Sequence, residues 1–80
     1  MKTPRDCDAT ELVRALRRLG YEVARQTGSH IRVVKPGDQP HHLTIPNHNP
    51  IKTGTLHGIL KDVAAQHHLS VEELLNTLDL

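Results

Sequence analysis

The sequence lacks phenylalanine and tryptophan, and Tyr21 is its only aromatic residue. Proteins that bind single-stranded nucleic acid stack bases on aromatic side chains, so this chain cannot build an aromatic stacking platform. Double-stranded RNA is instead recognised by shape, through phosphates and 2′-hydroxyls, which requires basic and polar side chains. The 80 residues are enough for one domain, over residues 1–80, with a small core of Leu, Ile, Val and Ala.

Cysteine and long apolar segments are also scarce. Cys7 is the single cysteine, so no internal disulfide can form and no cysteine pair offers a zinc site. No apolar run approaches the roughly 20 residues of a transmembrane helix. The N-terminal MKTPRDCDAT has no apolar segment of the kind found in signal peptides. These absences predict a protein of the reducing cytoplasm without a membrane segment.

Charge is distributed unevenly along the chain. Between Leu12 and Lys61 eight basic residues are opposed only by Glu22 and Asp38, which gives a net charge of +6. From Asp62 onward there are four acidic residues and no Lys or Arg, which gives a net charge of −4. A basic centre with an acidic tail indicates a polyanionic partner for the centre. The alternative is a solvated surface with uneven salt pairing.

Apolar residues at helical spacing predict three helices. The first is expected to run from a capping box at Asp8 and Glu11 to a stop at Gly20. The second is expected to be capped by Thr53. The third is expected to start in another capping box, SVEE at residues 70–73.

Alternating side chains predict three strands in a meander, over residues 21–26, 30–35 and 41–45. The resulting α-β-β-β-α order, with a short C-terminal helix added, is an α+β fold with a three-stranded antiparallel sheet. Because the first two helices each carry a single apolar stripe, both should cover the same face of the sheet. The other face should then be exposed, and the alternation places on it His30, Arg32, His42 and Thr44.

His30 is the strongest candidate for chemistry in this sequence. It follows a Gly28-Ser29 turn, with Arg25 and Arg32 nearby. A histidine takes or gives a proton near neutral pH, and in RNA the 2′-hydroxyl lies next to the phosphate. A base supported by cations can therefore cleave the strand without a metal. Gly28 would allow close approach of RNA and Ser29 would donate to a phosphate oxygen; the alternative is an ordinary surface histidine.

Two further groups of residues carry weaker indications. Lys52 and Thr53 stand at the start of a predicted helix, whose free N–H groups attract anions, so an RNA phosphate could bind there. The alternative is a simple threonine cap. A zinc site is a separate possibility, built from His30, His41, His42 and His48. Adjacent strand residues point to opposite faces and cannot easily share an ion, so we expect no metal and no cofactor.

Two segments contain several motifs in a fixed order, LVRALRRLGYEVARQTGSHIRVV and IPNHNPIKTGTLHGILKDV. In the order and spacing of these motifs the chain resembles the HicA toxins of bacterial type II toxin–antitoxin modules, over about residues 8–69. The resemblance implies a fold similar to double-stranded-RNA-binding domains and a ribosome-independent mRNA interferase activity. It also implies a catalytic histidine in the Gly-Ser-His motif, here His30, and neutralisation by a HicB antitoxin that covers the active site.

Together these observations predict a toxin that acts as a metal-independent endoribonuclease, with His30 as its catalytic residue. The residues expected to bind the RNA substrate are Arg25, Gly28, Ser29, Arg32, Lys52 and Thr53. The expected partners are mRNA and a HicB-type antitoxin, in a hetero-oligomer. His48 is a candidate second acid or base. The alternative function is a non-catalytic module that binds double-stranded RNA. The tail SVEELLNTLDL extends beyond the usual family length and would close the core or contact the antitoxin.

Overall fold

The computed structural model describes residues 6–80. The first five residues, which belong to the N-terminal stretch without an apolar segment, lie outside the described residues. The elements follow in the predicted order, with one 3-10 turn added after the first helix. They are α1 (Ala9–Leu16), η1 (Arg17–Leu19), β1 (Glu22–Thr27), β2 (His30–Lys35), β3 (His41–Pro46), α2 (Thr53–Gln66) and α3 (Val71–Leu78). Predicted and observed strand bounds differ by one residue at β1 and β3.

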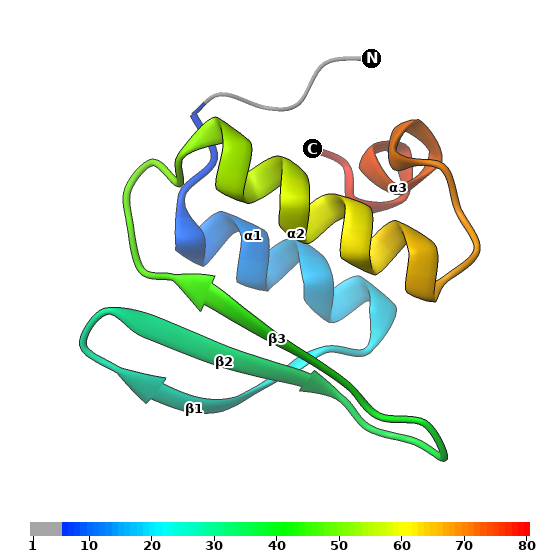
Figure 1. Cartoon of the computed structure of the whole chain (residues 1–80), viewed down its shortest axis with the longest axis horizontal. Coiled ribbons are helices and arrows are strands. Elements are labelled where there is room, and N and C mark those ends of the chain that lie inside the picture. Colours follow the sequence, from blue (N-terminus) through cyan, green and yellow to red (C-terminus); the bar gives the residue numbers. More distant parts are fainter. Residues whose placement is uncertain (1–5) are drawn as a thin grey trace.

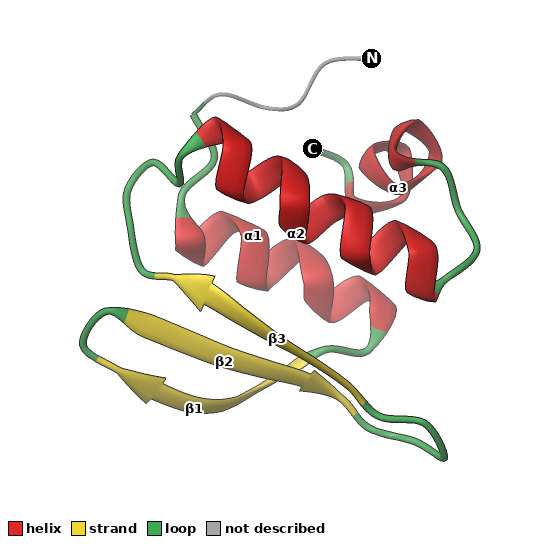
Figure 2. Ribbon diagram, viewed as in Figure 1, coloured by secondary structure: helices red, strands yellow, loops and turns green. Residues whose placement is uncertain are grey.

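The three strands form one antiparallel sheet in the order β1-β2-β3, so β1 and β3 are its edges. Both α1 and α2 lie on one face of the sheet, and α3 packs against α2 farther from the sheet (Figure 1). Within the described part of the chain, no helix covers the opposite face (Figure 2). This confirms the predicted α+β architecture. We call the helix-covered face of the sheet inner and the other face outer.

One hydrophobic core fills the space between the inner face and the helices. From the sheet it receives side chains of alternating residues, namely Ile31, Val33, Leu43 and Ile45. The apolar stripes of α1 and α2 supply most of the rest, and α3 adds Leu74, Leu75 and Leu78. The C-terminal extension therefore closes the core, which is the first of the two roles expected for it.

The starts of α1 and α2 differ from the predicted caps. Asp8 is the N-cap residue of α1, but its side chain accepts no cap hydrogen bond, so the predicted capping box is wrong. The N–H of Ala9 instead donates to the carbonyl of His48, at 3.3 Å. At α2 the N-cap position belongs to Lys52, whose side chain has no acceptor, and Thr53 is the first helical residue. The prediction that Thr53 caps this helix is therefore wrong.

Two other helix signals are confirmed. The Ser70 hydroxyl accepts from the Glu73 N–H, and the Glu73 carboxylate accepts from the Ser70 N–H, both at 3.0 Å. This is the reciprocal pair that a capping box requires. Gly20 ends η1 with φ of +94°, in the left-handed region where glycine has no steric penalty.

Candidate active site

A β-bulge in β1 sets the geometry of the outer face. Between Val23 and Arg25 the pairing with β2 slips by one position, which leaves Ala24 as the extra residue. In a regular strand Arg25 would share the inner face with Val23. The bulge turns Arg25 to the outer face, where it stands directly opposite Arg32. After the bulge, the side chains of β1 therefore alternate between the two faces of the sheet in the opposite order to the side chains before it.

A shallow depression of about 220 Å³ lies on this outer face, lined by His30, Arg25, Arg32, Thr27 and Thr44. Strand pairing brings these side chains together, because Thr27 is opposite His30 and Thr44 is opposite Arg32. All five residues are exposed. The alternation in the sequence predicts that Thr44 lies on this face but assigns it no role. It gives no signal for Thr27, because the bulge hides the true register of β1.

His30 begins β2 directly after the two-residue turn of Gly28 and Ser29. The Ser29 hydroxyl oxygen lies 3.0 Å from Nδ1 of His30. When the imidazole hydrogen is on Nδ1 it donates to Ser29, and the lone pair of Nε2 is left to accept a proton. A Cβ added at Gly28 would meet nothing within 4 Å, so the space beside the turn is open. The turn therefore orients the ring and leaves room for a ligand.

The basic residues around this site have no acidic partners in the described chain. Within residues 6–80 no Lys or Arg forms a salt bridge, and the one ion pair joins His41 to Asp62. The Lys and Arg side chains of the basic centre are therefore not neutralised by carboxylates of the described residues. Arg25 and Arg32 are moreover placed opposite each other, an arrangement that destabilises a sheet unless an anion lies between the two cations.

The remaining predicted site residues lie apart from the depression. Lys52 and Thr53 are exposed at the start of α2, in the helix layer on the inner side of the sheet (Figure 1). His48 is exposed in the connection between β3 and α2. That connection is anchored to the turn beside His30, because the N–H of Asn47 donates to the Ser29 carbonyl at 2.9 Å.

A second polar cluster lies where β3 meets α2. The hydroxyl of buried Tyr21 lies 2.5 Å from Nδ1 of His41 and 3.2 Å from Nε2 of His67. Nε2 of His41 lies 3.3 Å from a carboxylate oxygen of Asp62. Burial, reinforced by Asp62, raises the pKa of Tyr21 to about 12. Burial lowers the pKa of His67, and neighbouring basic groups lower it further. This cluster could not be predicted from the sequence, because its members are far apart in the chain.

The histidines do not gather into a metal centre in the described part of the chain. Within residues 6–80 no three His, Cys, Asp or Glu side chains are arranged to hold an ion. His41 pairs with Lys35 and His42 pairs with Val34, so the two neighbours point to opposite faces, as predicted. None of the described helices has the length and apolar character needed to cross a membrane.

Residues 9–64 match the family described as the HicA toxin of bacterial toxin-antitoxin, which is more than half of the chain. The chain belongs to the HicA toxin family. Searches among curated proteins and among solved structures gave no significant match.

This HicA toxin is therefore one component of a toxin–antitoxin module, and its counterpart is a cognate antitoxin. The matched residues include α1, the whole sheet and the depression around His30. They end before α3, which agrees with the expectation that the C-terminal helix is an extension of the HicA pattern.

Proposed function

We propose that this HicA toxin is a metal-independent endoribonuclease that cleaves mRNA, with His30 as its catalytic residue. The observation that carries the proposal is the exposed imidazole of His30, in a depression that also contains two directly opposed arginines without acidic partners. An RNA phosphate supplies the negative charge that Arg25 and Arg32 lack. Its neighbouring 2′-hydroxyl supplies the proton that the imidazole can take.

The chemistry requires one base and local positive charge. Nε2 of His30 takes the proton of the 2′-hydroxyl, and the 2′-oxygen forms a bond to the adjacent phosphorus. The bond from phosphorus to the 5′-oxygen of the next nucleotide breaks, and that oxygen receives a proton from the imidazolium or from water. The products are a 2′,3′-cyclic phosphate and a 5′-hydroxyl. Arg25 and Arg32 stabilise the charge that develops on the phosphate oxygens.

The other residues have positioning and binding roles in this proposal. Ser29 orients the His30 ring through Nδ1, and Gly28 leaves the approach to the turn open. Lys52 and Thr53 bind RNA phosphates beyond the depression, on the helix side of the molecule. The role of His48 as a second acid or base stays a prediction.

The cognate antitoxin is, in this proposal, of the HicB type and covers the outer face of the sheet in a hetero-oligomer. That face is exposed in the described chain and carries unpaired cations, so an antitoxin with acidic side chains could compete with RNA for it.

The direct test is cleavage of synthetic mRNA by the purified chain, its His30→Ala variant and a matched His42→Ala variant. His42 is also an exposed histidine of the outer face, but it pairs with Val34 toward the other end of β2. We expect His30→Ala to lower the cleavage rate at least about a hundredfold, because a general base is lost. We expect His42→Ala to cleave as wild type does, with 2′,3′-cyclic phosphate ends in both cases.

Three controls separate this proposal from its alternatives. RNA affinity of His30→Ala should stay near that of wild type, and its far-UV circular dichroism should be unchanged. Activity should survive EDTA. RNA that is bound but never cleaved by wild type would instead identify a non-catalytic double-stranded-RNA-binding module, and full cleavage by His30→Ala would remove His30 from the reaction.

A further inference from the structure

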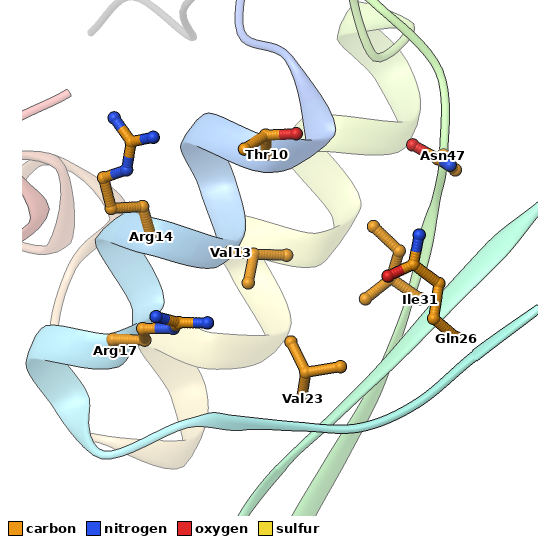
Figure 3. A pocket seen from close by; sticks show the side chains of 8 residues that line it. All are labelled: Thr10, Val13, Arg14, Arg17, Val23, Gln26, Ile31 and Asn47. Atoms are coloured by element: carbon orange, nitrogen blue, oxygen red, sulfur yellow. The ribbon is translucent and has the colours of Figure 1, made fainter.

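A groove of about 370 Å³ lies between α1 and the edge strand β1, on the inner side of the sheet (Figure 3). Its apolar surface comes from Val13 of α1 and from Val23 and Ile31 of the sheet. Val23 is 40% exposed, although large apolar side chains of the described chain are mostly buried. The proposed cleavage reaction does not use this groove.

Polar and charged side chains surround the apolar surface. The bulge that turns Arg25 outward turns Gln26 inward, and Figure 3 shows the Gln26 amide directed from β1 toward α1. Arg14 and Arg17 lie on the α1 side, and neither forms a salt bridge within residues 6–80. The groove thus combines an apolar surface, one amide with a donor and an acceptor, and two free cations.

The groove reaches the turn that precedes His30. Asn47 lines one end of it, and its side-chain amide donates to the Gly28 carbonyl at 3.4 Å. Gln26, in the groove, and Thr27, in the depression, are consecutive residues on opposite faces of β1. A chain that passes over the end of this edge strand can therefore occupy both places.

The edge strand β1 is poorly suited to pair with a strand of another protein chain. A bulge at Ala24 and a charged residue at Arg25 interrupt β1, and both features block the addition of another strand to a sheet edge. A second copy of the chain that docks through the same groove would bring the unpaired guanidinium groups of Arg14 and Arg17 close to identical ones. The unpaired guanidinium groups of Arg14 and Arg17 instead favour a polyanion as the ligand of the groove.

We propose that the groove holds one unpaired nucleotide of the RNA substrate, next to the phosphodiester that His30 cleaves. The flat base lies on Val13 and Val23, Gln26 forms hydrogen bonds with its polar edge, and Arg17 contacts its phosphate. Sequence-specific recognition of RNA generally uses such splayed bases. A side-chain amide that donates and accepts favours one base over others by roughly tenfold. The inference rests on the proposed nuclease function and assigns its sequence preference to Gln26.

The test is cleavage of a pool of RNA with randomised sequence by wild type, Gln26→Ala and Gln66→Ala, compared at equal total cleavage. Gln66 is an exposed residue at the end of α2 and serves as the matched control. We expect wild type and Gln66→Ala to share a base preference at one position beside the cut. Gln26→Ala should lose that preference by roughly tenfold at this position only. A parallel selection for binding, with His30→Ala and His30→Ala/Gln26→Ala, gives a readout that needs no cleavage.

The outcomes distinguish the two proposals. Cleavage by wild type with an unchanged preference in Gln26→Ala would overturn the nucleotide groove and leave the nuclease function intact. The absence of any cleavage by wild type would overturn the nuclease function, and the groove assignment with it. An unchanged RNA preference together with loss of antitoxin binding in Gln26→Ala would show that the groove is a protein contact instead.

Discussion

Arg25 and Arg32 are the residues at which folding and the proposed function conflict. They stand directly opposite each other on neighbouring strands, and neither has a carboxylate within salt-bridge distance in the described chain. Like charges in this arrangement destabilise a sheet by about 0.2–1 kcal/mol. In the proposed complex, a phosphate bound between the two arginines would remove this repulsion, so RNA binding would restore the stability that the free protein loses.

Replacement of Arg32 with threonine should therefore stabilise the protein and weaken its binding of RNA. Threonine suits an exposed strand position, and the relief of repulsion is worth about 0.5 kcal/mol, or roughly 2–4 °C in Tm. Thermal denaturation and RNA titration at low salt measure the two effects. Arg18→Ala removes an exposed guanidinium from η1 and should not raise Tm. A lower Tm for Arg32→Thr would show that the opposed arginines do not repel each other.

At the scale of elements, β2 and β3 could be predicted from the sequence more completely than β1. The first four residues of β2 alternate between exposed and buried, so their hydrophobic pattern indicates which side chains face the core. β1 is exposed at every position, so nothing in its pattern marks the register or the extra Ala24. The charge of Arg25 and its nearness in sequence make it a candidate, but only the bulge places it in the same depression as His30.

The helix starts also differ in how far the sequence predicts them. Ser70 and Glu73 form a capping box and lie only three residues apart, so this helix start can be predicted from the local sequence alone. The start of α2 depends instead on whether Lys52 or Thr53 takes the N-cap conformation. The N-cap position is set by the backbone conformation of the connection between β3 and α2. That connection is held by hydrogen bonds to residues distant in the sequence. A local pattern cannot predict it.

α3 should be necessary for stability, because its leucines lie inside the core. Leu74→Ala removes a fully buried side chain and should lower the free energy of unfolding by about 2–5 kcal/mol. Leu80→Ala removes the same atoms from an exposed position and should change it by less than about 0.5 kcal/mol. Denaturant unfolding measures both. An equally small effect of Leu74→Ala would mean that α3 is not needed to close the core and serves chiefly as a contact surface.

At the scale of the whole molecule, the depression around His30 and the second polar cluster lie at opposite ends of the sheet. His30 is the first residue of β2, beside the depression. Lys35 is the last, and it pairs with His41 of the second polar cluster. Through Tyr21 that cluster joins the sheet to His67 after the end of α2. The end opposite the proposed active site is thus held together by imidazole and hydroxyl groups.

This cluster makes global stability depend on pH. Burial lowers the pKa of His67 in the folded state, and Lys35, His41 and His68 lower it further. In the unfolded chain the pKa returns to its ordinary value of 6.5. The unfolded state then binds more protons than the folded state, so the free energy of unfolding decreases as the pH falls. The stabilising contribution is complete above pH 6.5 and is lost as pH falls through the lowered pKa of the folded state.

His67→Gln should make the protein less sensitive to acid. Glutamine retains an N–H donor for the Tyr21 hydroxyl but takes up no proton in this range, so the part of the pH dependence that comes from His67 is removed. Thermal denaturation of both proteins from about pH 7.5 to about pH 5 should give a shallower fall of Tm for the variant. Gln66→Ala, at the adjacent exposed position, should retain the slope of wild type. Parallel curves for wild type and His67→Gln would mean that His67 binds protons equally well in the folded and unfolded states.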